Sequence, residues 1–232
     1  MFRLVLLNNV PILEQLRLEE ALLRASTDNW CVLNTESPPA IVMGISGKPV
    51  ELLDQTRVQQ DRIPVIKRFS GGGTVYIDSQ TVFATLICNS NAVDVSLQPK
   101  LLLKWSEAFY APVFSGFSLR ENDYVLGDKK FGGNAQYIQK NRWLLHTSFL
   151  WDYAPEKMHY LLLPAKRPAY RQDRSHSDFL CPLHPYFPSK EALVSQLADN
   201  AQKQLGAKFV DAQAAFEHLH LPHRTSTTIV TL

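Results

Sequence analysis

Helical and strand-like spacings of apolar side chains alternate along the whole chain. Residues 11–26 repeat apolar positions every three or four residues with charges between them, which is typical of an amphipathic helix. Residues 50–60, 99–114 and 190–205 are further expected helices, and Ser189 is placed to cap the last of them. Short apolar runs predict strands at residues 1–7, 30–34, 40–45, 64–68, 73–77, 82–88 and 142–152.

Most of these expected strands follow one another closely, which favours antiparallel pairing. We therefore predict an α+β fold: a mainly antiparallel or mixed β-sheet with helices packed on one face. A chain of 232 residues is long enough for one large domain with a well-buried core, so residues 1–232 are taken as a single domain.

Composition narrows the class of protein without identifying a function. Lys and Arg number 24 against 22 Asp and Glu, so no general affinity for polyanions such as nucleic acid is implied. The three cysteines, at 31, 88 and 181, are odd in number and far apart, which argues against a disulfide framework and favours a reducing, cytoplasmic location. No apolar run reaches the roughly 18–20 residues of a membrane span.

Three consecutive glycines mark the first candidate site. Gly71, Gly72 and Gly73 join a basic strand-like run to a second one at residues 74–77. Bare backbone can turn its N–H groups toward an anion, and the guanidinium of Arg68 matches phosphate or carboxylate. The contiguous glycines fit neither a P-loop nor a dinucleotide-binding fingerprint. A glycine-rich hairpin with solvated cations is the competing interpretation.

A predicted hairpin carries the second candidate site. Apolar runs flank Gly127-Asp128, which is typical of a two-residue turn. Lys129 and Lys130 then lie on a strand and point to opposite faces. A lysine held on a strand and followed by glycines suits stabilisation of negative charge on phosphate. Two solvated lysines are the alternative.

Together the two motifs resemble the lipoate–protein ligase A family of the biotin/lipoate ligase superfamily. The motifs are Arg-x-Ser-Gly-Gly-Gly-x-Val-x-x-Asp at 68–78 and Asn-Asp-(x)n-Lys-x-x-Gly-x-Ala at 122–135. Further similarity at 15–23, 39–44 and 143–150 extends the resemblance over roughly residues 1–165. Biotin ligases carry an arginine-rich glycine loop instead, so the resemblance favours lipoate.

The resemblance implies a two-step, ATP-dependent reaction with Mg²⁺. The carboxylate of lipoate attacks the α-phosphate of ATP, and a lysine of an acceptor domain then attacks the resulting lipoyl-adenylate. Implied acceptors are lipoyl domains of 2-oxoacid dehydrogenase E2 subunits or the H protein of glycine cleavage.

Roles for individual residues also follow from the resemblance. Lys130 aligns with the active-site lysine, which bridges the lipoyl carboxyl group and the α-phosphate, and Asp123 is a candidate magnesium ligand. The implied ATP or adenylate site comprises Arg68, Gly73, Thr74, Val75, Tyr76, Asn122, Asp123 and Lys130. The implied lipoate site comprises Arg68, Ser70, Gly71, Gly72, Lys130 and Gly133.

Three departures from the family pattern leave alternatives open. Ile77 stands where many members have histidine, and Lys67 replaces the usual first arginine. The chain also ends without the accessory C-terminal domain of two-domain ligases, which suggests a separate accessory chain or a transferase. A transferase would carry the acyl group on Cys181, which lies near two histidines in sequence; a zinc cluster there does not match common ligand spacings.

The stretch from 164 to 174 is basic and contains a tyrosine. It is a candidate surface for acidic acceptor domains. It also allows a non-catalytic binding module of the same fold that binds an acidic partner or nucleic acid. The presence of Lys130 favours the enzyme.

Overall fold

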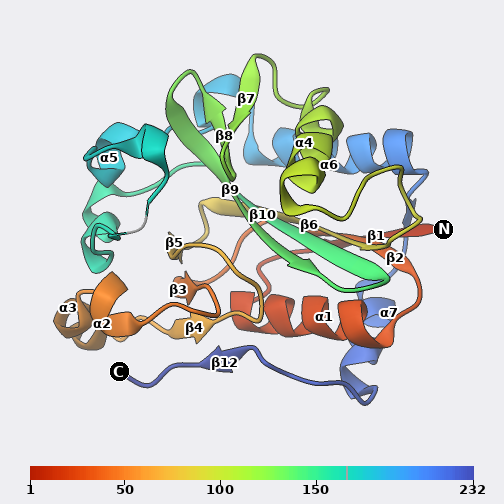
Figure 1. Ribbon diagram of the computed structural model, residues 1–232, viewed down its shortest axis with the longest axis horizontal. Coiled ribbons are helices and arrows are strands. Elements are labelled where there is room, and N and C mark those ends of the chain that lie inside the picture. Colours follow the sequence, from red (N-terminus) through yellow and green to blue (C-terminus); the bar gives the residue numbers. More distant parts are fainter. Residues whose placement is uncertain (166) are drawn as a thin grey trace.

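Two β-sheets form the framework of the computed structural model, which describes residues 1–165 and 167–232. The larger has eight strands in the order β11-β1-β2-β6-β10-β9-β8-β7, and the smaller has four in the order β12-β4-β3-β5. Figure 1 shows the small sheet beside one end of the large one. The α+β prediction with mixed sheets is confirmed.

The large sheet is mostly antiparallel. Only the pairs that β1 makes with β2 and β11 are parallel; the other neighbours are antiparallel. Its strands in spatial order are β11 (Lys208–Phe209), β1 (Phe2–Leu7), β2 (Asn29–Asn34), β6 (Thr81–Asn89), β10 (Arg142–Leu150), β9 (Lys129–Ile138), β8 (Asp123–Leu126) and β7 (Phe117–Arg120).

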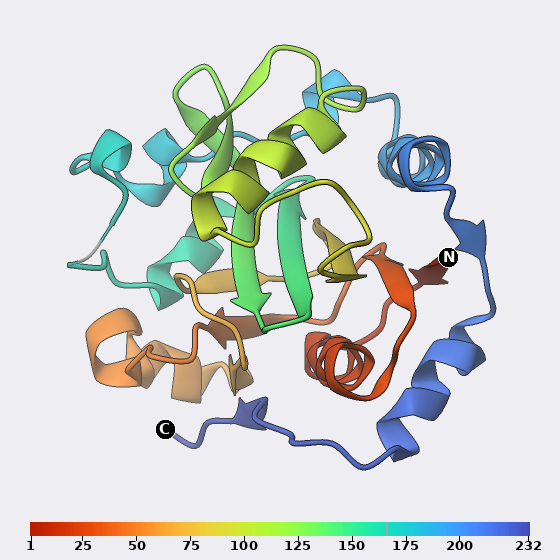
Figure 2. The same cartoon turned by 45° about the vertical axis from the view of Figure 1, so that its right-hand side comes forward.

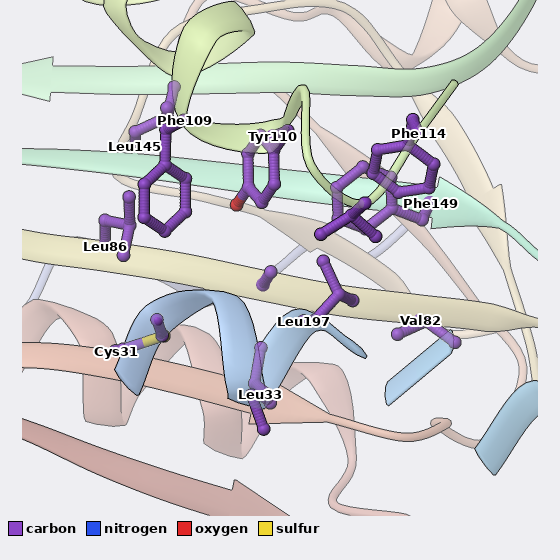
Figure 3. Packing of buried hydrophobic residues seen from close by; sticks show 14 of the residues in the cluster. Cys31, Leu33, Val82, Leu86, Phe109, Tyr110, Phe114, Leu145, Phe149 and Leu197 are labelled. Carbon is purple, nitrogen blue, oxygen red and sulfur yellow. The ribbon is translucent and has the colours of Figure 1, made fainter. Parts of the chain in front are cut away.

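Helices cover both faces of this sheet, so the expectation of one covered face is wrong. Alternate residues of β2 show why: Cys31 and Leu33 pack into one apolar cluster, and Trp30 and Val32 into another on the opposite face. Helices α4 (Pro99–Tyr110) and α6 (Lys190–Leu205) close the first cluster, and α1 (Ile12–Ala25) and α7 (Ala212–Phe216) close the second. Figure 1 shows these two pairs on opposite sides of the strands. Figure 3 shows the first cluster, in which side chains of α4 and α6 meet those of the sheet.

The small sheet contains β12 (Thr228–Ile229), β4 (Val65–Lys67), β3 (Ala40–Met43) and β5 (Val75–Ile77). Strand β3 lies between β4 and β5, parallel to the first and antiparallel to the second. The glycine loop connects β4 to β5, so it must cross the end of β3. The hairpin interpretation of this loop is therefore excluded.

Two expected helices have different limits in the structure. The helix expected at 50–60 is two short helices, α2 (Pro49–Leu52) and α3 (Gln55–Gln60), because Leu53 is extended and the Asp54 side chain caps α3 by accepting from the Arg57 amide. Helix α4 ends at Tyr110 rather than at 114, since Pro112 has no N–H to continue it. The prediction for 190–205 is confirmed, with Ser189 accepting from the Ala192 amide.

The segment after β10, drawn in teal in Figure 1, contains short turns of helix joined by irregular chain. They are η1 (Pro155–Tyr160), η2 (Ala169–Arg171), α5 (His176–Phe179) and η3 (His184–Tyr186), with η4 (Glu217–His220) later in the chain. Within the described residues, no helix has the length and apolarity needed to cross a membrane.

The C-terminal segment runs back along the molecule, past α1, to the small sheet, as Figure 2 shows. The buried carboxylate of Glu20 accepts from the amides of Ser226 and Thr227, at 2.9–3.0 Å. Strand β12 then pairs with β4, where Thr228 lies opposite Lys67. The last residues thus brace the strand that leads into the glycine loop.

Candidate active site

The glycine loop is locked over the end of β3 by backbone hydrogen bonds. The Arg68 amide donates to the Met43 carbonyl at 3.0 Å, and the Ile45 amide donates to the Ser70 carbonyl at 3.0 Å. The approach is so close that a Cβ on Gly44 would lie 2.2 Å from the Gly72 oxygen. Gly72 itself has φ +117°, a conformation that favours glycine. Glycines are therefore required on both sides of this contact.

Arg68 organises the loop from inside. Its side chain is buried, and its guanidinium donates to the carbonyls of Gly71 and Gly73, each at 3.0 Å from Nη2. Burial lowers the pKa of Arg68 to about 10, while the carboxylate of Glu19 acts in the opposite direction. The arginine is still charged at neutral pH. These donors, expected to bind a ligand, are directed at the loop's own carbonyls.

A β-bulge places Lys130 on the same side of β9 as Gly133. On β8, Val125 lies opposite Lys130 and Asp123 lies opposite Gly133. The pairing register of β8 and β9 shifts between these two residue pairs. Without the shift, residues 130 and 133 would point to opposite faces. A Cβ on Gly133 would lie only 2.9 Å from Lys130 Nζ, so glycine leaves room for the ammonium group. The Gly127-Asp128 turn is confirmed, and Lys129 is exposed.

Asp123 holds Lys130 in position. Lys130 Nζ lies 2.8 Å from Asp123 Oδ1, and the Tyr170 hydroxyl donates to Oδ2 at 2.8 Å. Burial and the Asp123 carboxylate keep the pKa of Tyr170 well above its usual value, so it remains a donor. A metal at Asp123 would have to displace one of these partners. In the described part of the chain, no group of three or more His, Cys, Asp or Glu is arranged to hold a metal ion.

A cavity lies between β5, β9, β10 and the segment after β10. Five predicted site residues line it: Thr74, Val75, Tyr76, Lys130 and Gly133. The other predicted residues are not part of its lining: they lie on the glycine loop or where β7 turns into β8, and they are Arg68, Ser70, Gly71, Gly72, Gly73, Asn122 and Asp123. Ile77 also lines it, on a largely apolar wall with Leu150, Met158, Leu161, Phe179 and Leu180.

Two cavity residues were missed by the sequence interpretation. Arg171 belongs to the basic stretch at 164–174, for which the sequence predicts a surface for partners, and His176 is one of the two histidines near Cys181 in sequence. Instead, this segment folds onto the site: the Cys181 amide donates to the Lys130 carbonyl at 2.8 Å, and Leu180 bridges to Lys130. The interleaved tyrosine was the available signal, since Tyr170 is the residue that reaches Asp123.

The charges around the cavity affect His176. Burial, followed by the nearby cations Arg171 and Lys130, lowers the pKa of His176 from 6.5 to about 4. Its imidazole is therefore neutral at physiological pH. The apolar wall and the cationic end together can hold a small molecule with a hydrocarbon part and an anionic head.

Cys181 stands apart from the cavity lining. Its sulfur is half-buried and lies 3.7 Å from the Pro182 carbonyl oxygen and 3.9 Å from the Tyr186 hydroxyl. Its nearest described polar partners are therefore not histidines. The other two thiols, Cys31 and Cys88, are buried in the core, and all three are free.

Known proteins resemble this chain in sequence and in structure. The family model described as lipoyl protein ligase A/B catalytic domain matches residues 11–204. The chain is 28% identical over 231 residues to a Plasmodium falciparum protein named "Inactive lipoate--protein ligase 2", a match covering 73% of this chain and 60% of that protein. The chain thus spans about 60% of that relative's length.

Solved structures share the fold. A lipoate-protein ligase A bound with ATP has a TM-score of 0.74 at 17% identity, covering 94% of this chain and 91% of that one. A chain from the bi-partite lipoate protein ligase of Thermoplasma acidophilum and its E2 lipoyl domain has a TM-score of 0.76 at 18% identity, covering 94% and 89%. The paired glycine and lysine motifs, the fold and the match over residues 11–204 show that this chain belongs to the lipoyl protein ligase A/B catalytic domain family.

Proposed function

We propose that the protein is a lipoate–protein ligase, which activates lipoate with ATP and transfers the lipoyl group to a lysine of an acceptor domain. The observation that carries the proposal is the position of Lys130. Its ammonium group lies at the cavity beside the strand that follows the glycine loop, fixed by Asp123 and given room by Gly133.

In the first step, a carboxylate oxygen of lipoate attacks the α-phosphorus of ATP and pyrophosphate leaves. Both reactants are anions, so the protein must bring them together against their repulsion. Lys130 has three N–H donors, and Asp123 uses one of them. The other two are available for the carboxylate and the α-phosphate, where charge builds up in the transition state.

In the second step, the amine of an acceptor lysine attacks the carbonyl carbon of lipoyl-adenylate. An amide bond forms, the bond to AMP breaks, and the proton of the amine is released. Because the adenylate is already a good leaving group, this step needs no nucleophile from the ligase. The apolar wall of the cavity suits the hydrocarbon chain and dithiolane ring of the lipoyl group.

The proposed acceptors are lipoyl domains of 2-oxoacid dehydrogenase E2 subunits or the H protein of glycine cleavage. The Thermoplasma acidophilum ligase is bi-partite, which supports testing this chain with a separate accessory chain as well as alone. Mg²⁺ is expected with the phosphates of ATP. Since both oxygens of Asp123 have protein partners, its role as a magnesium ligand stays a prediction.

ATP–pyrophosphate exchange tests the first step directly. We expect lipoate-dependent exchange by the purified chain with Mg²⁺. Lys130→Ala should reduce it about 10²- to 10³-fold, the range for loss of one group that stabilises transition-state charge. Lys129→Ala is the matched control, because the neighbouring lysine is exposed and points away from the cavity, and it should exchange at the wild-type rate.

Equal loss of exchange in the two lysine variants, or exchange that does not depend on lipoate, would contradict the proposal.

If exchange is absent with and without an accessory chain, two further measurements distinguish the two competing functions. A thioester adduct on Cys181, detected by mass spectrometry, would indicate an acyl transferase. Binding of lipoate without any transfer would indicate a binding module, and the Plasmodium falciparum relative, which is named an inactive ligase, makes this outcome worth testing.

A further inference from the structure

Arg171 is a buried arginine whose hydrogen bonding is incomplete. The residue is 6% exposed. Its Nε makes only a long contact of 3.4 Å to the Arg174 carbonyl, and its Nη2 has no hydrogen-bond partner among the described residues. The guanidinium lies over the ring of Phe179, with Cζ 4.8 Å from the centroid. A buried cationic donor without a partner is costly, and the described residues offer no acceptor for it.

A second buried polar atom on the same cavity also lacks a partner. It is the hydroxyl of Thr74, which follows the glycine loop. Only three buried side-chain polar atoms in the described residues are unpaired, and two of them belong to residues lining this cavity. A guanidinium N–H and a hydroxyl can both donate to the oxygens of one anion.

The described part of the chain does not provide that anion. Asp123 is the carboxylate whose charge acts on Arg171, but its two oxygens already accept from Lys130 and Tyr170. The neighbouring arginines have other partners: Arg174 contacts Asp128 and the Tyr170 carbonyl, and Arg167 contacts Asp173 and the Gln172 carbonyl. Arg171 is therefore the arginine of this segment whose donor remains for a ligand in the cavity.

The backbone next to Arg171 is strained, and hydrogen bonds from neighbouring arginines hold it in this conformation. Gln172 has φ 55° and ψ −137°, a combination that non-glycine residues rarely adopt. Arg167 Nε donates to the Gln172 carbonyl at 2.7 Å, and Arg174 Nη2 donates to the Tyr170 carbonyl at 2.7 Å. Such strain persists where surrounding contacts impose it, often at ligand sites.

We propose that Arg171 Nη2 and Thr74 Oγ1 bind a phosphate group of the nucleotide, beside Lys130. Identifying the anion as nucleotide phosphate rests on the proposed function; the presence of an oxyanion site does not. Lys130 alone cannot balance the charge of a triphosphate together with a carboxylate, and the donors of Arg68 are directed at loop carbonyls. Arg171 supplies the additional cation, with the planar fork that matches phosphate.

Calorimetric titration of four proteins tests this assignment: wild type, Arg171→Gln, Thr74→Val and Arg174→Gln. The ligands are α,β-methylene-ATP, inorganic pyrophosphate and lipoate. Arg171→Gln should weaken binding of both phosphate ligands about 10- to 100-fold, as expected for hydrogen bonds to a charged group, and leave lipoate affinity unchanged. Thr74→Val, which keeps the shape of the side chain, should weaken them about 3- to 10-fold.

Arg174→Gln is the matched control, because Arg174 lies over the same Phe179 ring but is not part of the cavity lining. It should change phosphate affinity less than about 3-fold. An equal loss in both arginine variants, or wild-type affinity in Arg171→Gln, would overturn the proposal. Loss of lipoate affinity with nucleotide affinity intact would overturn the phosphate assignment in favour of a carboxylate.

The ligase proposal and this proposal fail separately. Wild-type protein that binds pyrophosphate through Arg171 but shows no lipoate-dependent exchange would refute the ligase and support the oxyanion site. Suppose instead that the wild-type protein shows lipoate-dependent ATP–pyrophosphate exchange, and that Arg171→Gln and Thr74→Val change neither this exchange nor the affinity for the phosphate ligands. That result would support the ligase and refute the oxyanion site. Thermal melting without ligand confirms that each variant is folded.

Discussion

Two arginines near the cavity illustrate how differently the same side chain can be used. Arg68 and Arg171 are almost equally buried, at 5% and 6% exposure. Arg68 lies beneath a glycine loop that crosses a strand end and turns its carbonyls inward, and its donors satisfy those carbonyls. Arg171 lies in a turn whose carbonyls are bound by neighbouring arginines, and its Nη2 has no described partner. The surrounding backbone, rather than the residue type, decides which arginine holds the fold and which is available to a ligand.

The largest expected effect comes from changing the path of the loop above Arg68. Gly44→Ala places a Cβ 2.2 Å from the Gly72 oxygen, where only backbone movement can relieve the overlap. We expect a loss of about 3 kcal/mol in the free energy of unfolding, the upper part of the usual range for overpacking. Urea denaturation measures it.

Gly71→Ala is the control for that change, since a Cβ there meets nothing within 4 Å. It should leave stability within about 0.5 kcal/mol of wild type. Similar losses in both glycine variants would mean that general loop flexibility, and not the contact with β3, is what matters.

Removing each arginine separates the two roles. Arg68→Gln should lower the free energy of unfolding by about 2 kcal/mol, because it leaves the carbonyls of Gly71 and Gly73 without their charged donor. Arg171→Gln should leave stability unchanged or slightly raised, because it removes a buried donor that has no partner. Urea denaturation of the two variants shows whether the signs differ; a large loss in Arg171→Gln would contradict the comparison.

The smallest effect is a pH dependence at His176. Its pKa of about 4 lies below its ordinary value of 6.5, so the unfolded chain binds more protons between these values. Stability should therefore fall as the pH is lowered from about 6.5 toward 4. Because the side chain is partly exposed, we expect only about 1 kcal/mol from this residue, absent in His176→Gln.

Arg171→Gln sharpens the same measurement. Arg171 is one of the two cations that lower the pKa of His176, so an NMR titration should show that this pKa rises in the variant. An unchanged pKa would mean that burial and Lys130 set it, without a contribution from Arg171.

Much of the site was predictable because its signals are local. The turn at Gly127-Asp128 and the alternation along β9 place Lys129 outside and Lys130 at the cavity. The bulge that brings Gly133 to the same side as Lys130 was not predictable, since it depends on pairing with β8. The crossing of β3 was missed for the same kind of reason: β4 and β5 are adjacent in sequence, but another strand lies between them.

The sequence by itself determined the α+β class, most strand and helix positions, the two motifs and the turn that places Lys130 on a strand, because turn chemistry and apolar periodicity act over a few residues. Only the tertiary structure decided that helices cover both faces, that Arg68 is turned into its own loop, and that the basic segment folds over the cavity and brings Arg171 to it. These outcomes depend on which backbone carbonyls accept hydrogen bonds from a buried donor. Contacts between residues tens of positions apart in the sequence determine which carbonyls come within reach.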